Sequence, residues 1–439
     1  MLMAAVVALA LSGTAMAQNL KGFAYGDVAA PSGGEWESPM ELALNKEQPR
    51  GWFFTFANEE SARKVLPENS EYYLSLDGTW SFNWVGNPSE RPEEFYLPSY
   101  DVSGWDKVEV PMNWNVYGIQ SDGTQKYGTP VYTNQKVIFH HQVAVGDWKG
   151  GVMREPHQSH TTYKNRNEVG SYRRTFNVPA EWKGRQIYIN FDGVDSFFYL
   201  WINGKYVGFS KNSRNLAAFN ISKYLVEGEN VVAVEVYRNS DASFLEAQDM
   251  FRLPGIFRTV SLTATNPVEI RDIRVVTDLD AQYKDAVAKI DVDVRNLGKK
   301  KAKGYKLQAQ LYKNELYSDE NAVVEGAKVV GDVALIESGV MSTVQLAIEV
   351  ENPAKWSAEE PNRYTLVVQL LDKKGNVVET ASTHIGFREC EILDVAAKDD
   401  EFGIAGRYYY LNGKPIKMKG VNRHESSLER GHAVTREQM

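Results

Sequence analysis

The chain has 439 residues, of which 43% are hydrophobic and 12% aromatic, and its formal net charge is −8. This length predicts two or three domains, and the hydrophobic fraction is large enough to fill their cores. The acidic balance disfavours nucleic acid as a partner, because phosphates bind basic surfaces, and it leaves neutral substrates open. The 10 Trp and 23 Tyr residues are typical both of β-sheet cores and of surfaces that stack on sugar rings.

Residues 1–17 have the pattern of a secretory signal peptide. An apolar run from Ala4 to Leu11 precedes the stretch Ala-Met-Ala at residues 15–17, which matches a small-residue cleavage site. The run is too short to cross a bilayer as a mature helix, and no Cys at the cleavage site offers a lipid attachment point. We therefore expect an exported, periplasmic protein without a membrane anchor.

Residues 18–266 are predicted to form a jelly-roll domain with an N-terminal extension. Residues 18–69 show few alternating patterns and are interpreted as mostly loop. Short alternating stretches begin at Thr79 to Trp84 and become dense from Gly170, with no helical periodicity between them, which is typical of a β-sandwich or jelly roll. Asn203-Gly204 separates two such stretches and is a strong signal for a two-residue hairpin turn.

Asn266-Pro267 marks a boundary, and residues 267–388 are predicted to form an immunoglobulin-like β-sandwich. Four short strand-like stretches support this prediction: Val287 to Val294, Lys306 to Tyr312, Val344 to Val350 and Tyr364 to Leu371. The basic run Lys299 to Lys301 lies beside a turn signal, and we interpret it as a solvated turn rather than a binding patch.

The mature chain holds a single cysteine, Cys390. One thiol cannot form an internal disulfide, so no disulfide framework within the chain supports the fold. A lone cysteine usually packs as a small apolar residue, and we expect Cys390 to be buried.

Residues 389–439 are interpreted as the first strand region of a TIM (β/α)8 barrel. A hairpin signal at Asn412-Gly413 precedes an apolar-leaning strand, Pro415 to Val421, which ends in the polar run Asn422 to Glu425. Barrel strands deliver active-site groups at their C-terminal ends in this way, but a complete barrel needs roughly 250 residues. We therefore expect a truncated barrel and, in the chain expressed alone, a disordered or aggregation-prone tail after about Arg388.

Several short motifs follow one another along the chain. They are Val110-Pro111-Met112-Asn113-Trp114, Pro130-Val131-Tyr132-Thr133-Asn134, Phe191-Asp192-Gly193-Val194-Asp195-Ser196, Leu200-Trp201-Ile202-Asn203-Gly204, Gln248 to Arg258, Trp356-Ser357 before Pro361-Asn362, Ile385-Gly386-Phe387-Arg388 and Gly420 to Glu425. In this order they resemble the family 2 glycoside hydrolases, and within them the large β-galactosidases, from about Glu35 to Met439. The resemblance implies a retaining β-galactosidase built from a sugar-binding domain, a sandwich and a TIM barrel.

Retaining glycosidases use two carboxyl groups about 5–5.5 Å apart. The resemblance implies that both are Glu on later barrel strands, the acid/base preceded by Asn. The pairs Asn58-Glu59, Asn167-Glu168 and Asn314-Glu315 lie outside the barrel segment and are interpreted as structural. Glu425 matches a structural residue near the site entrance, so we expect no catalytic Glu and no catalytic magnesium ligand in this chain. For the full-length enzyme, the resemblance implies magnesium and sodium as cofactors.

The resemblance assigns three substrate-binding residues to this chain. Asn134 matches a residue of the sugar-binding domain that hydrogen-bonds galactose. His424 matches a residue that contacts the sugar from the first barrel strand and stabilises the transition state. Asn212 stands where the family usually has an Asp that touches both the sugar and a sodium ion. An amide keeps the hydrogen bonds but carries no charge, which puts sodium binding in doubt.

The stretch Gln135 to Val169 departs from the family pattern and contains four histidines: His140, His141, His157 and His160. Two histidines three residues apart can bind zinc. No cysteine and no second convincing pair accompanies them, so a solvated loop is the favoured interpretation.

Three functional hypotheses remain open. The first is a β-galactosidase that acts on terminal β-galactosides, whose full-length form is a homo-oligomer. The second is a non-catalytic carbohydrate-binding remnant, which fits a chain without the catalytic Glu pair. The third is a family 2 enzyme of another specificity, a β-glucuronidase or β-mannosidase. The motifs around Tyr132 and from Asn422 to Glu425 favour the galactoside.

Overall fold

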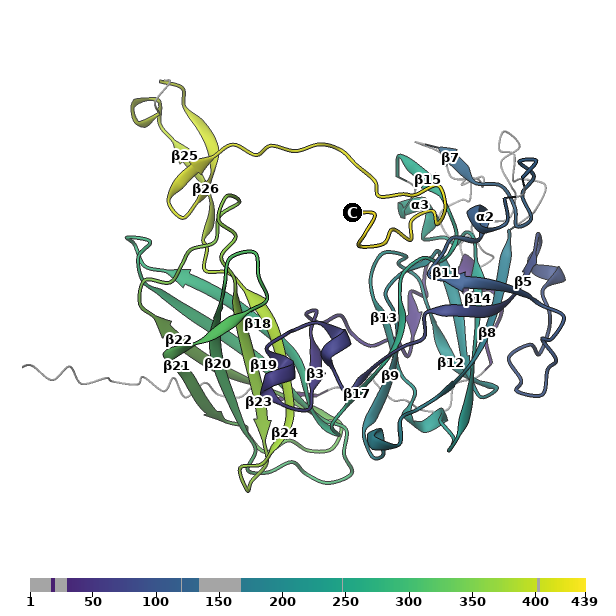
Figure 1. The fold of residues 1–439 in the computed structure, drawn as a ribbon, viewed down its shortest axis with the longest axis horizontal. Coiled ribbons are helices and arrows are strands. Elements are labelled where there is room, and N and C mark those ends of the chain that lie inside the picture. Colours follow the sequence, from purple (N-terminus) through teal and green to yellow (C-terminus); the bar gives the residue numbers. More distant parts are fainter. Residues whose placement is uncertain (1–16, 20–29, 120, 134–166, 247, 401–402) are drawn as a thin grey trace, which may run out of the picture. The chain divides into compact units, whose positions relative to one another are not determined.

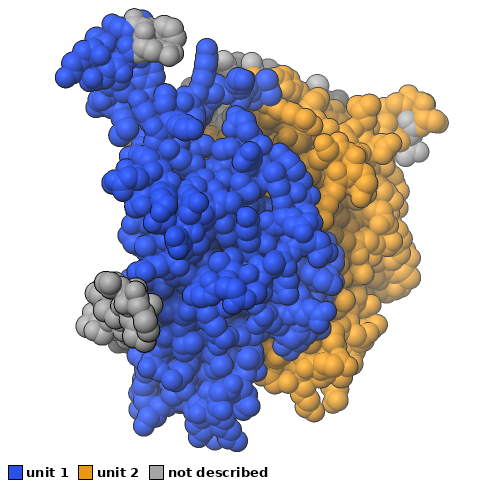
Figure 2. Space-filling view, turned by 60° about the vertical axis from the view of Figure 1, so that its left-hand side comes forward, with its two compact units in different colours: residues 1–21, 50–73, 265–421 blue, residues 22–49, 74–264, 422–439 orange. Residues whose placement is uncertain are grey.

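The computed structural model describes residues 17–19, 30–119, 121–133, 167–246, 248–400 and 403–439. They divide into two compact units that are each discontinuous in sequence (Figure 2). Unit 1 comprises residues 1–21, 50–73 and 265–421, and unit 2 comprises residues 22–49, 74–264 and 422–439. The sequence predicted that residues 18–266 form one domain. In the structure, residues 50–73 of that range instead group with the second sandwich.

Unit 2 is built around two sheets, of which the larger is antiparallel throughout (Figure 1). The seven-stranded sheet has the order β2 (Ala43–Leu44), β12 (Lys205–Ser210), β11 (Phe197–Ile202), β14 (Glu229–Tyr237), β8 (Val169–Asn177), β5 (Gly78–Val85) and β6 (Asp106–Val110). The four-stranded sheet has the order β13 (Ala217–Asn220), β9 (Gln186–Phe191), β17 (Val260–Thr265) and β4 (Tyr73–Ser75). All six residues of the central strand β11 are buried, so its near-continuous apolar run reflects burial on both faces.

Short elements complete unit 2. Two-stranded ladders join β10 (Val194–Asp195) to β16 (Gly255–Ile256) and β7 (Val131–Thr133) to β15 (Met250–Arg252). The helices are α2 (Trp114–Tyr117), α3 (Ser243–Glu246) and the 3-10 turns η1 (Glu35–Glu37), η3 (Pro88–Glu90), η5 (Ala180–Trp182) and η6 (Ser222–Tyr224). The aromatic core on one face of the large sheet includes Trp36, which stacks on Tyr237 at a centroid distance of 5.2 Å.

Unit 1 contains the predicted sandwich. One sheet has the order β1 (Ala17–Asn19), β22 (Val340–Val350), β19 (Ala286–Asn296) and β18 (Val268–Leu279). The other has the order β21 (Asn321–Asp332), β20 (Lys306–Asn314), β23 (Tyr364–Leu371), β24 (Val377–Ile385) and β3 (Phe54–Phe56). Alternate residues of β22 are buried, as expected for a strand with one face on the core. The helical turns are α1 (Glu59–Ala62), η2 (Pro67–Asn69) and η7 (Ala397–Asp399).

The jelly-roll-like and immunoglobulin-like β architecture is confirmed, and so are several local predictions. In the hairpin turn Asn203-Gly204 the two φ angles are 51° and 79°, and in Asn412-Gly413 they are 50° and 74°. Positive φ at both central residues is what a type I′ turn requires, and Asn and Gly adopt it most readily. Lys299 to Lys301 form an exposed turn, as predicted, and Lys301 pairs with Glu337 at 2.6 Å.

Residues 389–421 depart from the sequence prediction. A three-stranded antiparallel sheet, β25 (Cys390–Val395), β26 (Gly406–Leu411) and β27 (Lys414–Ile416), occupies this segment, for which the sequence predicted a disordered or aggregation-prone tail after about Arg388. The predicted strand over residues 415–421 ends at Ile416 and pairs antiparallel with β26. A parallel barrel strand needs neighbours for its backbone hydrogen bonds, and no TIM barrel is visible among the described residues.

One further expectation is corrected. Cys390 is exposed, not buried, because the small sheet to which it belongs has no core over it. The described part of the extension is mostly loop, as expected, but β2 and β3 each add a short strand to the edge of a larger sheet. Strands of two or three residues are too short for alternation to be recognised in a sequence.

Candidate functional site

Asn212 lies in unit 2 on the loop between β12 and β13. It is exposed and has a φ of 76°, in the left-handed region that Asn tolerates better than most residues. Its neighbours Lys211 and Ser213 are both buried. The structure therefore places this predicted sugar contact at the surface of a loop that is anchored on both sides.

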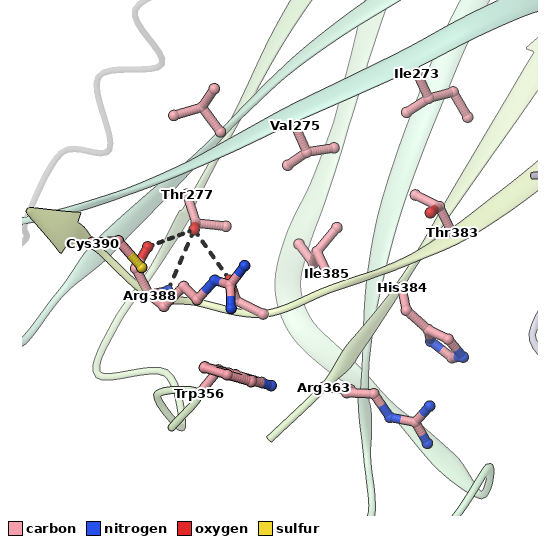
Figure 3. A pocket seen from close by; sticks show the side chains of 12 residues that line it. Ile273, Val275, Thr277, Trp356, Arg363, Thr383, His384, Ile385, Arg388 and Cys390 are labelled. Carbon is pink, nitrogen blue, oxygen red and sulfur yellow. Dashed lines mark hydrogen bonds between the residues drawn. The ribbon is translucent and has the colours of Figure 1, made fainter. Parts of the chain in front are cut away.

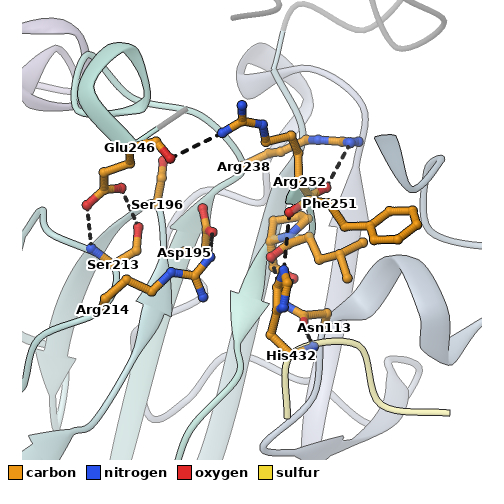
Figure 4. Close-up of polar contacts among 12 residues, drawn as sticks. Asn113, Asp195, Ser196, Ser213, Arg214, Arg238, Glu246, Phe251, Arg252 and His432 are labelled. Atoms are coloured by element: carbon orange, nitrogen blue, oxygen red, sulfur yellow. Dashed lines mark hydrogen bonds and ion pairs between the residues drawn. The ribbon is translucent and has the colours of Figure 1, made fainter. Parts of the chain in front are cut away.

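A cluster of charged groups lies beside this loop (Figure 4). The carboxyl of Asp195 lies 3.4 Å from Arg214, two residues after Asn212. Burial raises the pKa of Asp195 to about 6, and the positive charge of Arg214 opposes that rise. Arg252 donates to the backbone carbonyl of Glu246 at 3.2 Å. These groups line a small cavity of about 30 Å³, which is enough for a water molecule rather than a sugar.

Arg238, which lines this cavity, forms a buried ion pair with Glu168. Arg238 Nη1 lies 2.5 Å from Glu168 Oε1, and both side chains are about 2% exposed. Arg238 also donates to the carbonyl of Thr129 at 2.9 Å. Removing either residue would leave an uncompensated buried charge. The ion pair therefore fixes the position of the Arg238 side chain in the cavity wall.

The predicted contact Asn134 lies outside the described residues, and so do the four histidines His140, His141, His157 and His160. The strand that leads to Asn134 is described: Thr133 on β7 is paired with Met250 on β15, and Met250 lines the cavity. The hydroxyl of Tyr132 donates to Asp249 just before β15. The described part of β7 therefore ends at Thr133, which is paired with a residue that lines the cavity.

His424 is exposed in the irregular segment that follows β27. The nearby residue His432 is half-buried and connects this segment to unit 2. Its backbone N–H donates to Asn113 Oδ1 at 2.7 Å, and its Nε2 lies 3.1 Å from the carbonyl oxygen of Phe251. Burial lowers the pKa of His432, and the charges of Arg214 and His424 lower it further. Residues from the Asn212 loop and from the His424 segment therefore lie near the same imidazole.

Several site residues were not singled out from the sequence: Asp195, Arg214, Glu246, Arg252 and His432. Asp195 and Arg252 fall within the motifs that carried the family resemblance, and that signal could have found them. Glu246 gives no local signal, because its contact with Ser213 joins residues 33 positions apart. His432 was hidden in a segment interpreted as an unfinished barrel.

The three Asn-Glu pairs have structural partners, which supports their interpretation as non-catalytic. Asn58 caps α1 by accepting a hydrogen bond from the N–H of Ser61, and Glu59 accepts one from the hydroxyl of Tyr312. Glu168 is buried against Arg238. Asn314 accepts from Thr365 Oγ1 at 2.9 Å, and the N–H of Glu315 donates to Glu320 within a hairpin.

A hollow much larger than the cavity beside Asp195 lies in unit 1 (Figure 3). It has a volume of about 670 Å³ and lies along β18 and β24, where Arg388 stacks over Trp356 at 4.5 Å. None of its lining residues is Asp or Glu. Glycoside hydrolysis requires carboxyl groups, so this hollow is a poor candidate for that chemistry despite its size.

Fold and site together define a modular β-sandwich protein whose first sandwich carries a polar site at its loop ends. Residues 73–267 match the sugar binding domain of glycosyl hydrolases family 2, and residues 268–388 match a second domain of glycosyl hydrolases family 2. The chain belongs to this family. Among the described residues, no helix combines the length and apolar character that crossing a membrane requires.

Two curated relatives are named beta-galactosidase. The protein from Priestia megaterium is 37% identical over 414 residues, which cover 93% of this chain and 36% of that protein. The protein from Halalkalibacterium halodurans is 33% identical over 398 residues, which cover 91% of this chain and 34% of that protein. The chain thus spans about a third of the length of the curated relatives it matches.

A Bacteroides uniformis beta-glucuronidase is among the similar solved structures. It has a TM-score of 0.62 and 20% sequence identity, over 83% of this chain and 37% of that chain. At this identity the likeness supports the fold alone.

Proposed function

We propose that the complete protein encoded by the gene for this chain hydrolyses terminal non-reducing β-D-galactosides with retention. The observation that carries this proposal is the match at 37% identity along 93% of the chain to a protein named beta-galactosidase. In this proposal, the 439 residues supply part of the sugar-binding face. The acid/base and nucleophile Glu lie outside them.

Asn134, Asn212 and His424 are the proposed substrate-binding residues. The amide of Asn212 is exposed on an anchored loop and can both donate to and accept from a sugar hydroxyl. His424 is exposed in the segment that also contains His432. Both His432 and Arg214 contact the ring of Phe257. This shared contact between the His424 segment and the Asn212 loop supports one sugar-binding face on unit 2.

The chemistry of retention requires two displacements by a pair of carboxyl groups. Asp195 and Glu246 are already engaged by Arg214 and Ser213, so we assign them structural roles in the sugar-binding face rather than catalysis. A galactoside bound here would be oriented by hydrogen bonds from this chain. Orientation of this kind lowers the entropic part of the barrier to reaction.

Magnesium, sodium, homo-oligomerisation and export stay predictions for the complete protein. Within the described ranges, no group of three His, Cys, Asp or Glu side chains is arranged to hold a metal ion. Asn212 fits a neutral sugar hydroxyl better than a sodium ion, because its side chain carries no charge.

Hydrolysis of p-nitrophenyl glycosides by the complete protein tests the proposal. We expect turnover of the β-galactoside, with β-glucuronide and β-mannoside cleaved far more slowly. An Asn212→Ala variant should lower kcat/KM for the galactoside, whereas Glu227→Ala, at an exposed glutamate of the same unit, should not. Preference for the glucuronide would replace the assigned specificity. No hydrolysis of any of the three glycosides would favour a non-catalytic binding protein.

A further inference from the structure

The loop that carries Asn212 is held on both sides by polar contacts that are at least partly buried. Before it, Lys211 Nζ lies 2.6 Å from Asp241 Oδ1 and donates to the carbonyl of Ser38 at 2.6 Å. After it, Ser213 donates twice to Glu246, from its backbone N–H at 2.8 Å and from its hydroxyl at 2.6 Å. Asn212 itself is exposed between these two anchors.

The burial of the anchors shows how firmly the loop is held. The side chains of Lys211 and Asp241 are 3% and 9% exposed, and Ser213 is 1% exposed as a residue. Breaking a buried charged contact leaves an unpaired group in a medium of low dielectric, which is unfavourable. The loop therefore has little freedom to move without losing this buried ion pair and several part-buried hydrogen bonds.

The two carboxylates that hold the loop, those of Asp241 and Glu246, belong to one short segment that includes α3. The N–H of Asp241 donates to the carbonyl of Trp36 at 3.0 Å, and the N–H of Ser240 donates to Ser243 Oγ at 3.1 Å. The carbonyl of Glu246 accepts from Arg252 at 3.2 Å, as Figure 4 shows. Asp241 and Glu246, which together we call the clamp, are thus attached to the rest of unit 2 by several hydrogen bonds.

A carboxylate suits position 246 for a specific reason. Its two oxygens accept from two donors of the same residue, Ser213, which fixes both the backbone and the side chain of that residue. The preceding residue, Asn212, has a φ of 76°, a conformation that persists where its surroundings hold it. Glutamine could accept only one of the two hydrogen bonds, and alanine neither.

We propose that Glu246 is a positioning residue that holds the Asn212 amide in the orientation that meets the sugar, with the Lys211–Asp241 pair as the second anchor. This inference rests on the proposed function, in which Asn212 contacts the galactoside. Glu246 acts through Ser213 and does not itself touch the sugar.

The first experiment tests the clamp in the 439-residue chain, without any activity. Hydrogen exchange is measured for the backbone amides of residues 211–214 in Glu246→Ala, Glu246→Gln and Glu227→Ala. The Ala variant should exchange at these amides at least tenfold faster than the parent chain, the Gln variant should be intermediate, and the exposed control should be unchanged. Equal protection in Glu246→Ala and the parent chain would overturn the clamp.

The second experiment tests positioning in the complete protein, with p-nitrophenyl β-galactoside as the probe. Glu246→Ala should lower kcat/KM roughly tenfold, the ratio that about 1.4 kcal/mol of lost interaction produces. Glu246→Gln should recover part of that loss. In an Asn212→Ala background, Glu246→Ala should cause little further loss, because both changes remove the same sugar contact.

The outcomes separate the two proposals. Fully additive effects of Glu246→Ala and Asn212→Ala would overturn the positioning role, since a purely structural effect would persist in either background. A parent protein that hydrolyses no galactoside would refute the proposed function while the exchange result still decides the clamp. An unchanged kcat/KM in Glu246→Ala, with a clear loss in Asn212→Ala, would refute positioning alone.

Discussion

Glu235 shows how burial controls the ionisation of a single side chain in unit 2. It lies on β14 with 4% exposure, accepts a hydrogen bond from Tyr237 at 2.9 Å and lies 3.3 Å from Arg91 Nε. Burial raises the pKa of Glu235 to about 7, and these two partners only partly oppose the rise. The carboxyl therefore titrates near neutral pH in the folded chain but near 4.5 when the chain is unfolded.

The sign of the resulting pH dependence follows from proton binding. Between the unfolded and folded pKa values the native state binds more protons, so the stability contributed by this group falls as pH rises from about 4.5 to about 7. We expect Glu235→Gln to remove this decline, with a difference of up to roughly 3 kcal/mol between pH 5 and pH 8. Urea unfolding at both pH values measures it. Glu229→Gln, at an exposed residue of the same strand, is the control, and an identical pH slope in Glu235→Gln and the parent chain would contradict the assignment.

Residue-level prediction succeeded where the signal was local. Asn203 and Gly204 specify their turn by their own conformational preferences, and the turn formed as predicted. The position of Asn212 on the loop after the Asn-Gly hairpin followed from its place in a motif. The clamp by Glu246 and the approach of His432 to Asn113 could not be predicted, because these contacts join residues 33 and 319 positions apart.

At the scale of elements, the small sheet β25–β26–β27 exposes an apolar row. The register aligns Ile392 with Tyr409 and Tyr409 with Ile416 across the three strands. Their exposed fractions are 58%, 48% and 42%. A three-stranded sheet with an uncovered apolar face is prone to associate with other chains. The aggregation predicted from the sequence for this segment therefore stays a prediction, now with specific residues.

Replacing the outer members of this row should reduce association of the 439-residue chain. We expect the Ile392→Thr/Ile416→Thr variant to scatter less light and to begin aggregating at a higher protein concentration than the parent chain. Val330→Thr is the matched control. Val330 is 52% exposed on β21, in the five-stranded sheet of unit 1, and lies outside the row. Aggregation of the double variant at the parent's concentration would show that another surface is responsible.

Prediction of elements failed where neighbours decide the outcome. The strand β3 is three residues long, and it exists because β24 offers it a free edge, with Thr55 paired to Ala381. The predicted strand over residues 415–421 has a suitable sequence, but past Ile416 no described strand pairs with it. Strand formation in both places depends on a partner, which no local pattern contains.

At the scale of the whole molecule, the organisation into two discontinuous units makes a prediction about residues 50–73. Phe56 on β3 is fully buried in a cluster with Ala62, Tyr312 and Val367, so the extension completes the hydrophobic interior of unit 1. Replacing a buried Phe by Ala lowers the free energy of unfolding by about 3–5 kcal/mol, because transfer free energy is lost and a cavity is left behind. We therefore expect Phe56→Ala to destabilise unit 1 by that amount.

Hydrogen exchange, measured separately for each strand, shows which backbone amides lose protection in this variant. In Phe56→Ala, amides of β3, β23 and β24 should lose protection, because they surround the cavity or pair with the strand that carries it. Phe82→Ala is the matched control: Phe82 is equally buried, but it lies on β5 in unit 2, and its loss should expose β5 and β8. If residues 50–73 instead belonged with unit 2, as the linear division assumed, Phe56→Ala would loosen β5 and β8 and leave β23 and β24 protected.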